Sequence, residues 1–287
     1  MSAATVATNR PRSTSRFRPA RTLRYVAIYG FLVVVLIPVY VLLVTSFKTS
    51  GEATAAHAWA LPQNWSLDNW KLAWETLSPS MWRSVQIVVP QAIIAAILGS
   101  INGFILSRWK FRGANIIFTL ILFGMFIPYQ AVIIPLTKFL LALEVPSGVP
   151  SLILLHVVYG IPITTLIFRN YYESVPNELI EAARMDGAGL MRTYGSVVLP
   201  ISIPSFVVVL IWQFTNAWND YLFAVFFSTA RNGPVTLALN NLANGAQLQD
   251  YGASMAGALL ASFPTLIVYI VLGKYFIGGL MSGSVKG

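Results

Sequence analysis

The sequence predicts an all-α integral membrane protein with six transmembrane helices and both termini in the cytoplasm. Hydrophobic residues make up 56% of its 287 residues and charged residues only 10%, whereas soluble proteins carry about 25% charged residues. Six charge-free intervals are each long enough to cross a membrane, because a helix needs about 20 apolar residues to span the hydrocarbon core. Lys and Arg are also distributed unequally between the connections that join these intervals.

The chain begins with a basic segment and a first span. Residues 1–24 contain six arginines and no acidic residue, so this tail is expected to lie in the cytoplasm against anionic lipid headgroups. The next 22 residues carry no charge. That length exceeds a signal-peptide core, and no convincing cleavage site follows, so they are interpreted as a retained span.

Five further charge-free intervals, of 24, 25, 24, 27 and 23 residues, supply the other spans. Together the six spans form one membrane domain over residues 25–280, followed by a cytoplasmic C-terminal tail, residues 281–287. The predicted spans cover residues 25–46, 84–107, 113–137, 148–168, 199–223 and 252–273.

The basic residues set the orientation of these spans. With the N-terminus inside, the inner side carries 14 Lys and Arg residues and the outer side five. Positive charge favours the cytoplasmic side, so both termini and the connection 173–200 are expected there. The net charge of +9 is thus accounted for by positive residues that face membrane lipid on the cytoplasmic side. Nucleic acid is not expected as a partner.

The connection between the fourth and fifth spans, residues 173–200, holds four of the ten acidic residues. Ser174 and Asn177 are candidate N-caps of a helix there, with Pro176 in its first turn. Gly187 can supply the left-handed conformation that ends the helix. From these features alone the connection is either an ordinary amphipathic linker or a docking element for another protein.

The spacing within this connection matches a known pattern. The residues that carry it are Glu181, Ala182, Ala183, Gly187, Val197, Leu199 and Pro200. They resemble the EAA loop of ABC importer permeases, with Val197 in place of the usual Ile. In that family the loop is the coupling helix, which seats in a cleft of the cytoplasmic ATPase. The resemblance assigns coupling to Glu181, Ala182, Ala183, Arg184, Asp186, Gly187 and Pro200.

The resemblance extends over nearly all of the chain beyond the basic tail. The segments 102–113, 156–189 and 211–223 are similar to carbohydrate permeases of the maltose-transporter type. Residues 274–287 resemble the tail of the smaller, MalG-like subunit. Within this class the fourth and fifth spans look most like glucose/mannose-type permeases. The tail is either a frayed terminus or a contact to the ATPase through Ser284, Val285, Lys286 and Gly287.

The family implies an ATP-driven sugar importer that works by alternating access in a bacterial or archaeal cytoplasmic membrane. Its expected partners are a second, larger permease (MalF-type), a homodimeric ATPase that binds ATP and Mg, and an extracytoplasmic sugar-binding protein. The chain itself contains no phosphate-loop motif, so it is expected to bind no cofactor and to be no enzyme.

Polar residues in the fifth span form the candidate substrate path. Gln213, Asn216 and Asp220 would share one stripe of a helix. Such groups are costly in lipid and should face another helix or a wet cavity. They either join helices by hydrogen bonds or line the route of a sugar. The full candidate set is Gln213, Asn216, Asn219, Asp220, Trp218, Tyr221 and His156.

Several other functions find little support. The chain has no Cys and two His. This composition excludes a disulfide framework and predicts no metal site. It also offers few residues that could serve in catalysis. An ion-coupled secondary carrier stays an alternative, although no paired carboxylates lie in the spans. The outer connection 47–82 contains five Trp residues, which form either an interfacial aromatic belt or a docking surface for the external binding protein.

Overall fold

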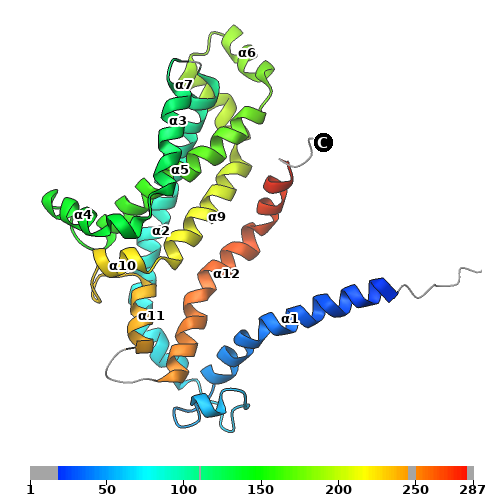
Figure 1. The fold of residues 1–287 in the computed structure, drawn as a ribbon, viewed down its shortest axis with the longest axis vertical. Helices are drawn as coiled ribbons and strands as arrows, with labels where there is room; N and C mark the ends of the chain where they lie inside the picture. Colours follow the sequence, from blue (N-terminus) through cyan, green and yellow to red (C-terminus); the bar gives the residue numbers. More distant parts are fainter. Residues whose placement is uncertain (1–18, 110, 245–249, 283–287) are drawn as a thin grey trace, which may run out of the picture.

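The computed structural model describes residues 19–109, 111–244 and 250–282. These residues form helices and loops, with no strand among them. The elongated bundle in Figure 1 carries the connection 173–200 at one end and the loop 47–67 at the other. Most of the basic tail and the proposed ATPase contact at 284–287 lie outside the described residues.

Twelve α-helices and three elements of other helix types follow one another along the described chain. These three are the 3₁₀ turns η1 (Ala55–His57) and η2 (Gly124–Phe126) and the π-helical turn η3 (Tyr194–Val198). The α-helices are α1 (Pro19–Ser46), α2 (Asp68–Arg108), α3 (Ala114–Phe123), α4 (Tyr129–Ala142), α5 (Val149–Ser174), α6 (Asn177–Met185), α7 (Leu190–Thr193), α8 (Leu199–Ile201), α9 (Ile203–Asn219), α10 (Leu222–Phe227), α11 (Val235–Asn244) and α12 (Tyr251–Ser282).

Four of the described helices, α1, α2, α5 and α12, are long and apolar enough to cross a membrane. They fall on the first, second, fourth and sixth predicted spans. Helix α2 starts 16 residues before its predicted span and contains 41 residues. At 1.5 Å per residue it is about 61 Å long, so it reaches well beyond the hydrocarbon core.

The third and fifth predicted spans correspond to two pairs of helices with a sharp bend between the members of each pair. A pair counts as one span only when its two helices are taken together. The chain turns by 98° between 114–126 and 129–142, and by 77° between 190–201 and 203–219. Pro128 explains the first turn, because Ile127 before it is extended, with ψ 112°, as a residue before proline prefers. Counting charge-free residues measures apolar length and cannot detect such breaks.

The fifth predicted span also ends early. Helix α9 stops at Asn219, and Asp220 is extended, with ψ 128°. The chain then starts the separate helix α10 at Leu222. Asp220 therefore does not continue the helical stripe of Gln213 and Asn216 that the sequence predicts.

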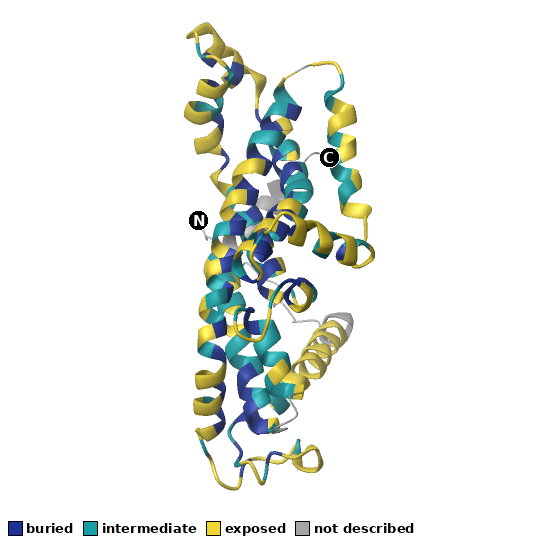
Figure 2. Ribbon diagram, turned by 90° about the vertical axis from the view of Figure 1, so that its left-hand side faces the viewer, coloured by how far each residue is buried: buried dark blue, intermediate teal, exposed yellow. Residues whose placement is uncertain are grey.

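Helices α2 and α5 form the centre of the bundle because two glycines on α2 allow a very close approach. A Cβ atom added to Gly103 would lie 2.7 Å from the backbone N of Arg169 and 2.8 Å from Cβ of Phe168. Gly99 faces Thr164 one turn away in the same way. Figure 2 shows the buried residues gathered along the middle of the bundle, while exposed residues cover its flanks and both ends.

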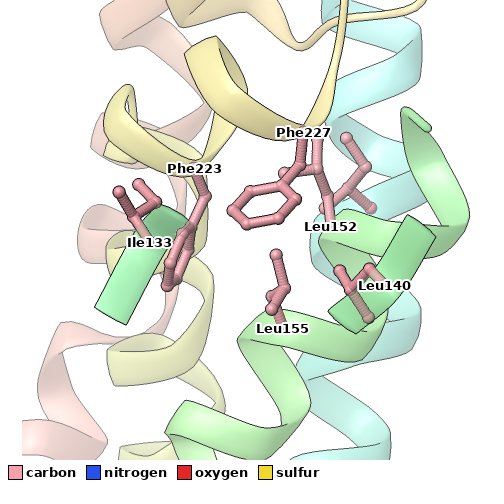
Figure 3. Close-up of a cluster of buried hydrophobic side chains, with 7 residues drawn as sticks. Ile133, Leu140, Leu152, Leu155, Phe223 and Phe227 are labelled. Atoms are coloured by element: carbon pink, nitrogen blue, oxygen red, sulfur yellow. The ribbon is translucent and has the colours of Figure 1, made fainter. Parts of the chain in front are cut away.

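Around this pair the apolar core is divided along the length of the bundle. One cluster, drawn in Figure 3, packs Phe223 and Phe227 of α10 against α4 and α5. A second cluster lies toward α6 and joins α2, α5, η3 and α9. The buried members of this second cluster are Ala96, Phe104, Phe168, Tyr172, Ile180, Val198 and Val209.

The loop after α1 is a folded cap. The Lys48 side chain is only 1% exposed, and its Nζ donates to the carbonyl oxygen of His57 at 2.6 Å. Burial lowers the pKa of the Lys48 ammonium, and the nearby Glu52 carboxylate partly opposes this shift. Asn69 Nδ2 donates to the Lys48 carbonyl oxygen at 2.7 Å, so the cap is fixed to the start of α2.

Gly103→Ala should destabilise the protein by about 1–3 kcal/mol, because the added methyl meets the backbone of α5 and forces the helices apart. Thermal unfolding of the purified protein in detergent measures this. Gly30→Ala on α1 is the matched control, since no atom lies within 4 Å of its added Cβ. Equal melting temperatures for the two variants would refute the close-packing argument.

Candidate functional site

Helix α6 begins at Asn177 in a way that differs from the expected capping. Pro176 occupies the N-cap position, and no side chain caps the helix. The prediction that Ser174 or Asn177 is the N-cap is therefore wrong. Ser174 ends α5, where its Oγ donates to the carbonyl oxygen of Tyr171 at 2.7 Å, and Val175 is extended because it precedes a proline.

Arg108, the last residue of α2, fastens the start of α6 to the bundle. Its guanidinium donates hydrogen bonds to Asn177 Oδ1 and to the backbone oxygens of Tyr172 and Val175. Hydrogen bonds from a charged donor are about twice as strong as neutral ones. Ile180 of α6 adds an apolar contact with the second core cluster.

The end of α6 agrees with the prediction made for Gly187. This residue has φ +76°, its N–H donates to the carbonyl oxygen of Arg184, and Ala188 N–H donates to that of Ala183, both at 2.9 Å. These two bonds form a Schellman motif. Glu181 and Arg184, three residues apart on this helix, form no ion pair with each other in the described chain.

The predicted coupling residues lie mostly on the surface. Ala183 is buried together with Ile180, whereas the opposite face of α6 is open, and Met185 is 88% exposed. This open face carries charged side chains of both signs together with small residues. The exposed coupling residues are Glu181, Ala182, Arg184, Asp186, Gly187 and Pro200.

A second short helix follows α6. This helix, α7, ends at Thr193, where the π-helical turn η3 begins. A short piece containing Pro200 then leads into the 77° bend before α9. A π-helical turn is rare and often marks a functional site.

Two of the candidate path residues join helices to one another. Gln213 is buried, and its Nε2 donates to the carbonyl oxygen of Gly160 at 3.2 Å. Its own carbonyl oxygen accepts from Gln91 Nε2 at 3.0 Å. Trp218 is also buried, and its Nε1 donates to the carbonyl oxygen of Ala261 at 2.9 Å.

The other candidates on α9 lie at its surface. Asn216 and Asn219 are exposed, and each Nδ2 donates to the carbonyl oxygen four residues earlier. Tyr221, beyond the end of the helix, is 40% exposed. These side chains are therefore available to a neighbouring subunit or a passing solute.

His156 and Asp220 come together although they lie far apart in the sequence. His156 Nε2 and Asp220 Oδ2 are 3.8 Å apart, with the side chains 11% and 12% exposed. Oδ2 is buried and has no hydrogen-bond partner among the described residues. Phe223 lies against the His156 ring, with ring centres 5.4 Å apart, and Tyr129 packs on Phe223 at 4.9 Å.

Tyr159 packs on Tyr129 and Phe223, with ring centres 6.1 Å and 5.4 Å apart. We call Tyr129, His156, Tyr159, Asp220 and Phe223 the aromatic cluster. A carboxylate, an imidazole and two phenols can exchange hydrogen bonds with hydroxyl groups, and the rings offer flat apolar faces. Sequence reasoning did not place Tyr129 or Phe223 in the path, because only the breaks in the helices bring them beside His156. No group of three His, Cys, Asp or Glu residues suited to a metal occurs in the described chain.

Comparison with known proteins gives a consistent result. Residues 93–280 match the family model described as binding-protein-dependent transport system inner membrane component. A probable ABC transporter permease of Pyrococcus horikoshii is 46% identical over 64% of this chain and 68% of its own length. The xylose/arabinose import permease of Haloferax volcanii is 35% identical over 91% and 92%.

A further relative and a solved structure extend the comparison. The melibiose/raffinose/stachyose import permease of Bacillus subtilis is 31% identical over 88% of this chain and 91% of its own. A bacterial ABC transporter involved in import of the acidic polysaccharide alginate superposes with a TM-score of 0.76 at 20% identity, covering 93% of this chain and 100% of the other. The fold is therefore shared with that transporter.

Arg108→Met should loosen the start of α6, because Asn177 and two backbone oxygens lose their donor. Amide hydrogen exchange in residues 175–186 should become faster, while α12 keeps its protection. Arg112→Met is the control, since no hydrogen bond or ion pair is found for that guanidinium in the described chain. Unchanged exchange in 175–186 would show that the clamp does not hold α6.

Proposed function

Because the chain belongs to the family of binding-protein-dependent transport system inner membrane components, we propose that it is the permease subunit of an ATP-driven ABC importer that carries a sugar into the cell. The observation that carries this proposal is α6, a short helix with an exposed face and the EAA spacing at one end of the bundle. Relatives named for import of xylose/arabinose and melibiose/raffinose/stachyose support a carbohydrate as the substrate.

The orientation follows from the charge distribution. We propose that both bent helix pairs count as spans, which gives six crossings with both termini in the cytoplasm. The end of the bundle that carries α6 then lies in the cytoplasm, and the cap around Lys48 lies outside. A multi-pass protein of the cytoplasmic membrane in a bacterium or archaeon fits this arrangement.

The proposed complex contains four kinds of subunit. This chain pairs with a larger permease of the MalF type, two copies of an ATPase bind ATP and Mg, and an external protein delivers the sugar. A further alginate transporter structure, described as a complex with a pentasaccharide-bound periplasmic protein, supports a partner of this last kind. In it the chain with this fold has a TM-score of 0.62 at 12% identity.

We propose that α6 docks on the ATPase through its exposed face. Glu181, Arg184 and Asp186 would make polar contacts there, while Ala182 allows a close approach. When ATP closes the ATPase dimer, the docked helix would move, and α5 and α9 on either side of it would move with it. The sugar path between the two permease subunits would open outward to receive sugar and would open inward again after hydrolysis.

The proposed sugar path runs beside the aromatic cluster. Asp220 Oδ2 is buried without a hydrogen-bond partner in the described chain, so it would accept a hydrogen bond from a sugar hydroxyl once the helices around it separate. His156 would orient that carboxylate, and the exposed Asn216 and Asn219 would line the same route. Gln213, by contrast, supports the wall through its bond to α5, as Trp218 does through its bond to α12.

Replacing Glu181 and Gly187 together by Ala should reduce sugar uptake by about tenfold or more, within the usual range of coupling between sites. The change removes a docking charge and strains the left-handed residue that ends α6. Uptake and ATP hydrolysis are measured together in proteoliposomes that contain the whole complex and the binding protein. ATPase activity should continue without matching uptake.

Gly30→Ala on α1 is the control for this experiment, because no atom lies within 4 Å of its added Cβ and its φ is not positive. Normal coupling in the double variant would contradict the role of α6. Uptake that persists without the ATPase but stops when the membrane potential is removed would instead indicate the ion-coupled carrier.

Asp220→Asn should weaken sugar uptake by about tenfold, because hydrogen bonds to a charged group are worth about 1.5–3 kcal/mol. The dependence of uptake on sugar concentration distinguishes weaker binding from a slower cycle. Asp68→Asn, a change at an exposed carboxylate on α2, should leave uptake unchanged. Identical uptake curves for wild type and Asp220→Asn would remove Asp220 from the path.

A further inference from the structure

Four hydroxyl groups meet in the apolar second core cluster, beneath η3. They belong to Ser100 of α2, Tyr172 of α5, Tyr194 of η3 and Ser202 at the bend before α9. Ser100, Tyr172 and Ser202 are completely buried. Hydroxyl groups are costly to bury unless each has a hydrogen-bond partner. These four should therefore be paired with one another or with the backbone.

The distances define a continuous chain. Tyr194 OH and Ser100 Oγ are 2.8 Å apart, and Ser100 Oγ and Tyr172 OH are 2.5 Å apart. Tyr172 OH lies 3.3 Å from Ser202 Oγ, which donates to the Leu199 carbonyl oxygen at 2.8 Å. We call these four side chains the hydroxyl chain.

Each hydroxyl has one proton, so the direction of every bond in the chain is fixed. Ser202 gives its proton to Leu199, and Tyr172 therefore donates to Ser202. Ser100 must then donate to Tyr172, and Tyr194 to Ser100. All four donors are satisfied in this one order, and bonds linked in series polarise and strengthen one another.

The hydroxyl chain connects both ends of a short segment to the body of the bundle. Tyr194 begins the π-helical turn and Ser202 lies at the 77° bend, whereas Ser100 and Tyr172 lie on the closely packed pair α2 and α5. Tyr171, next to Tyr172, also donates to the Ile201 carbonyl oxygen at 2.5 Å. The bend that leads into α9 is thus held from α5 by two successive tyrosines.

A displacement of η3 relative to α2 would break the Ser100–Tyr194 bond and leave buried hydroxyls unpaired. Intermediate positions are therefore unfavourable, and the contact should be either made or broken. An element with two discrete arrangements is what a mechanical signal between distant sites requires. The segment also lies directly between α6 and α9, which the proposed function requires to move together.

We propose that Tyr172 is a positioning residue for coupling: through the hydroxyl chain it makes α9 follow the movement of α6. This inference rests on the proposed function, because it concerns how the ATPase stroke reaches the spans. The structural part of the proposal, the link between α6 and the bend, does not depend on transport. Without the Tyr172 hydroxyl, α6 and the bend before α9 should move separately.

The test uses Tyr172→Phe, which keeps the ring and removes only the hydroxyl. In proteoliposomes with the whole complex and the binding protein, sugar uptake should fall by about tenfold while ATP hydrolysis continues, so ATP consumed per sugar rises. Ser202→Ala should do the same. The double variant should resemble either single variant, because breaking the chain once is sufficient.

The matched control is Thr165→Val, which removes another completely buried hydroxyl on α5 that has no hydrogen-bond partner in the described chain. It should leave the ratio of ATP to sugar unchanged. If Tyr172→Phe lowers uptake and hydrolysis in equal proportion, or additively with Ser202→Ala, the residue only stabilises the fold and the inference is overturned.

Amide hydrogen exchange of the purified complex tests the inference without relying on transport. Tyr172→Phe should speed exchange in both 177–185 and 194–206, and Thr165→Val in neither. Unchanged exchange in these segments would overturn the proposed link. If Tyr172→Phe shows the faster exchange but the wild-type complex shows no ATP-driven uptake, the importer function is refuted while the hydroxyl chain stands.

Discussion

The close contact between α2 and α5 is the constraint on which the rest of the structure depends. Gly99 and Gly103 leave α2 without a side chain at two points of the contact, so Thr164, Phe168 and the backbone of α5 can lie directly against α2. Ser100 and Arg108 on the same helix then come within reach of Tyr172. If the helices stood further apart, α6 would lose its clamp and η3 its buried partner.

The close contact of α2 and α5 supports two regions of the bundle with different chemistry. Toward α6, polar groups in an apolar surrounding hold a short helix whose outer face stays open. Near α10, breaks in the helices bring Asp220 beside His156, and three packed aromatic rings lie next to His156. The proposed docking helix α6 and the polar site at Asp220 both depend on one closely packed helix pair, which suits a transporter that is driven from one face.

The sequence predicted the parts of this arrangement that depend on composition and local spacing. Apolar length identified the long helices, and the spacing around Gly187 identified the end of α6. The breaks at Pro128 and Ser202 were missed because hydropathy counts apolar residues without testing the continuity of a helix. The contact of Arg108 with Asn177 was missed because the two residues are far apart in the chain, and no local pattern records a tertiary hydrogen bond.

The proposed importer function requires that α6 face the cytoplasm and touch the ATPase. The chain contains no cysteine, so Met185→Cys on the exposed face of α6 introduces a single thiol. A thiol crosslinker applied to membranes that contain the complex should join this position to the ATPase subunit, and an impermeant thiol reagent added outside intact cells should not label it. Labelling from outside, or crosslinks to the external binding protein and none to the ATPase, would contradict the proposed importer function.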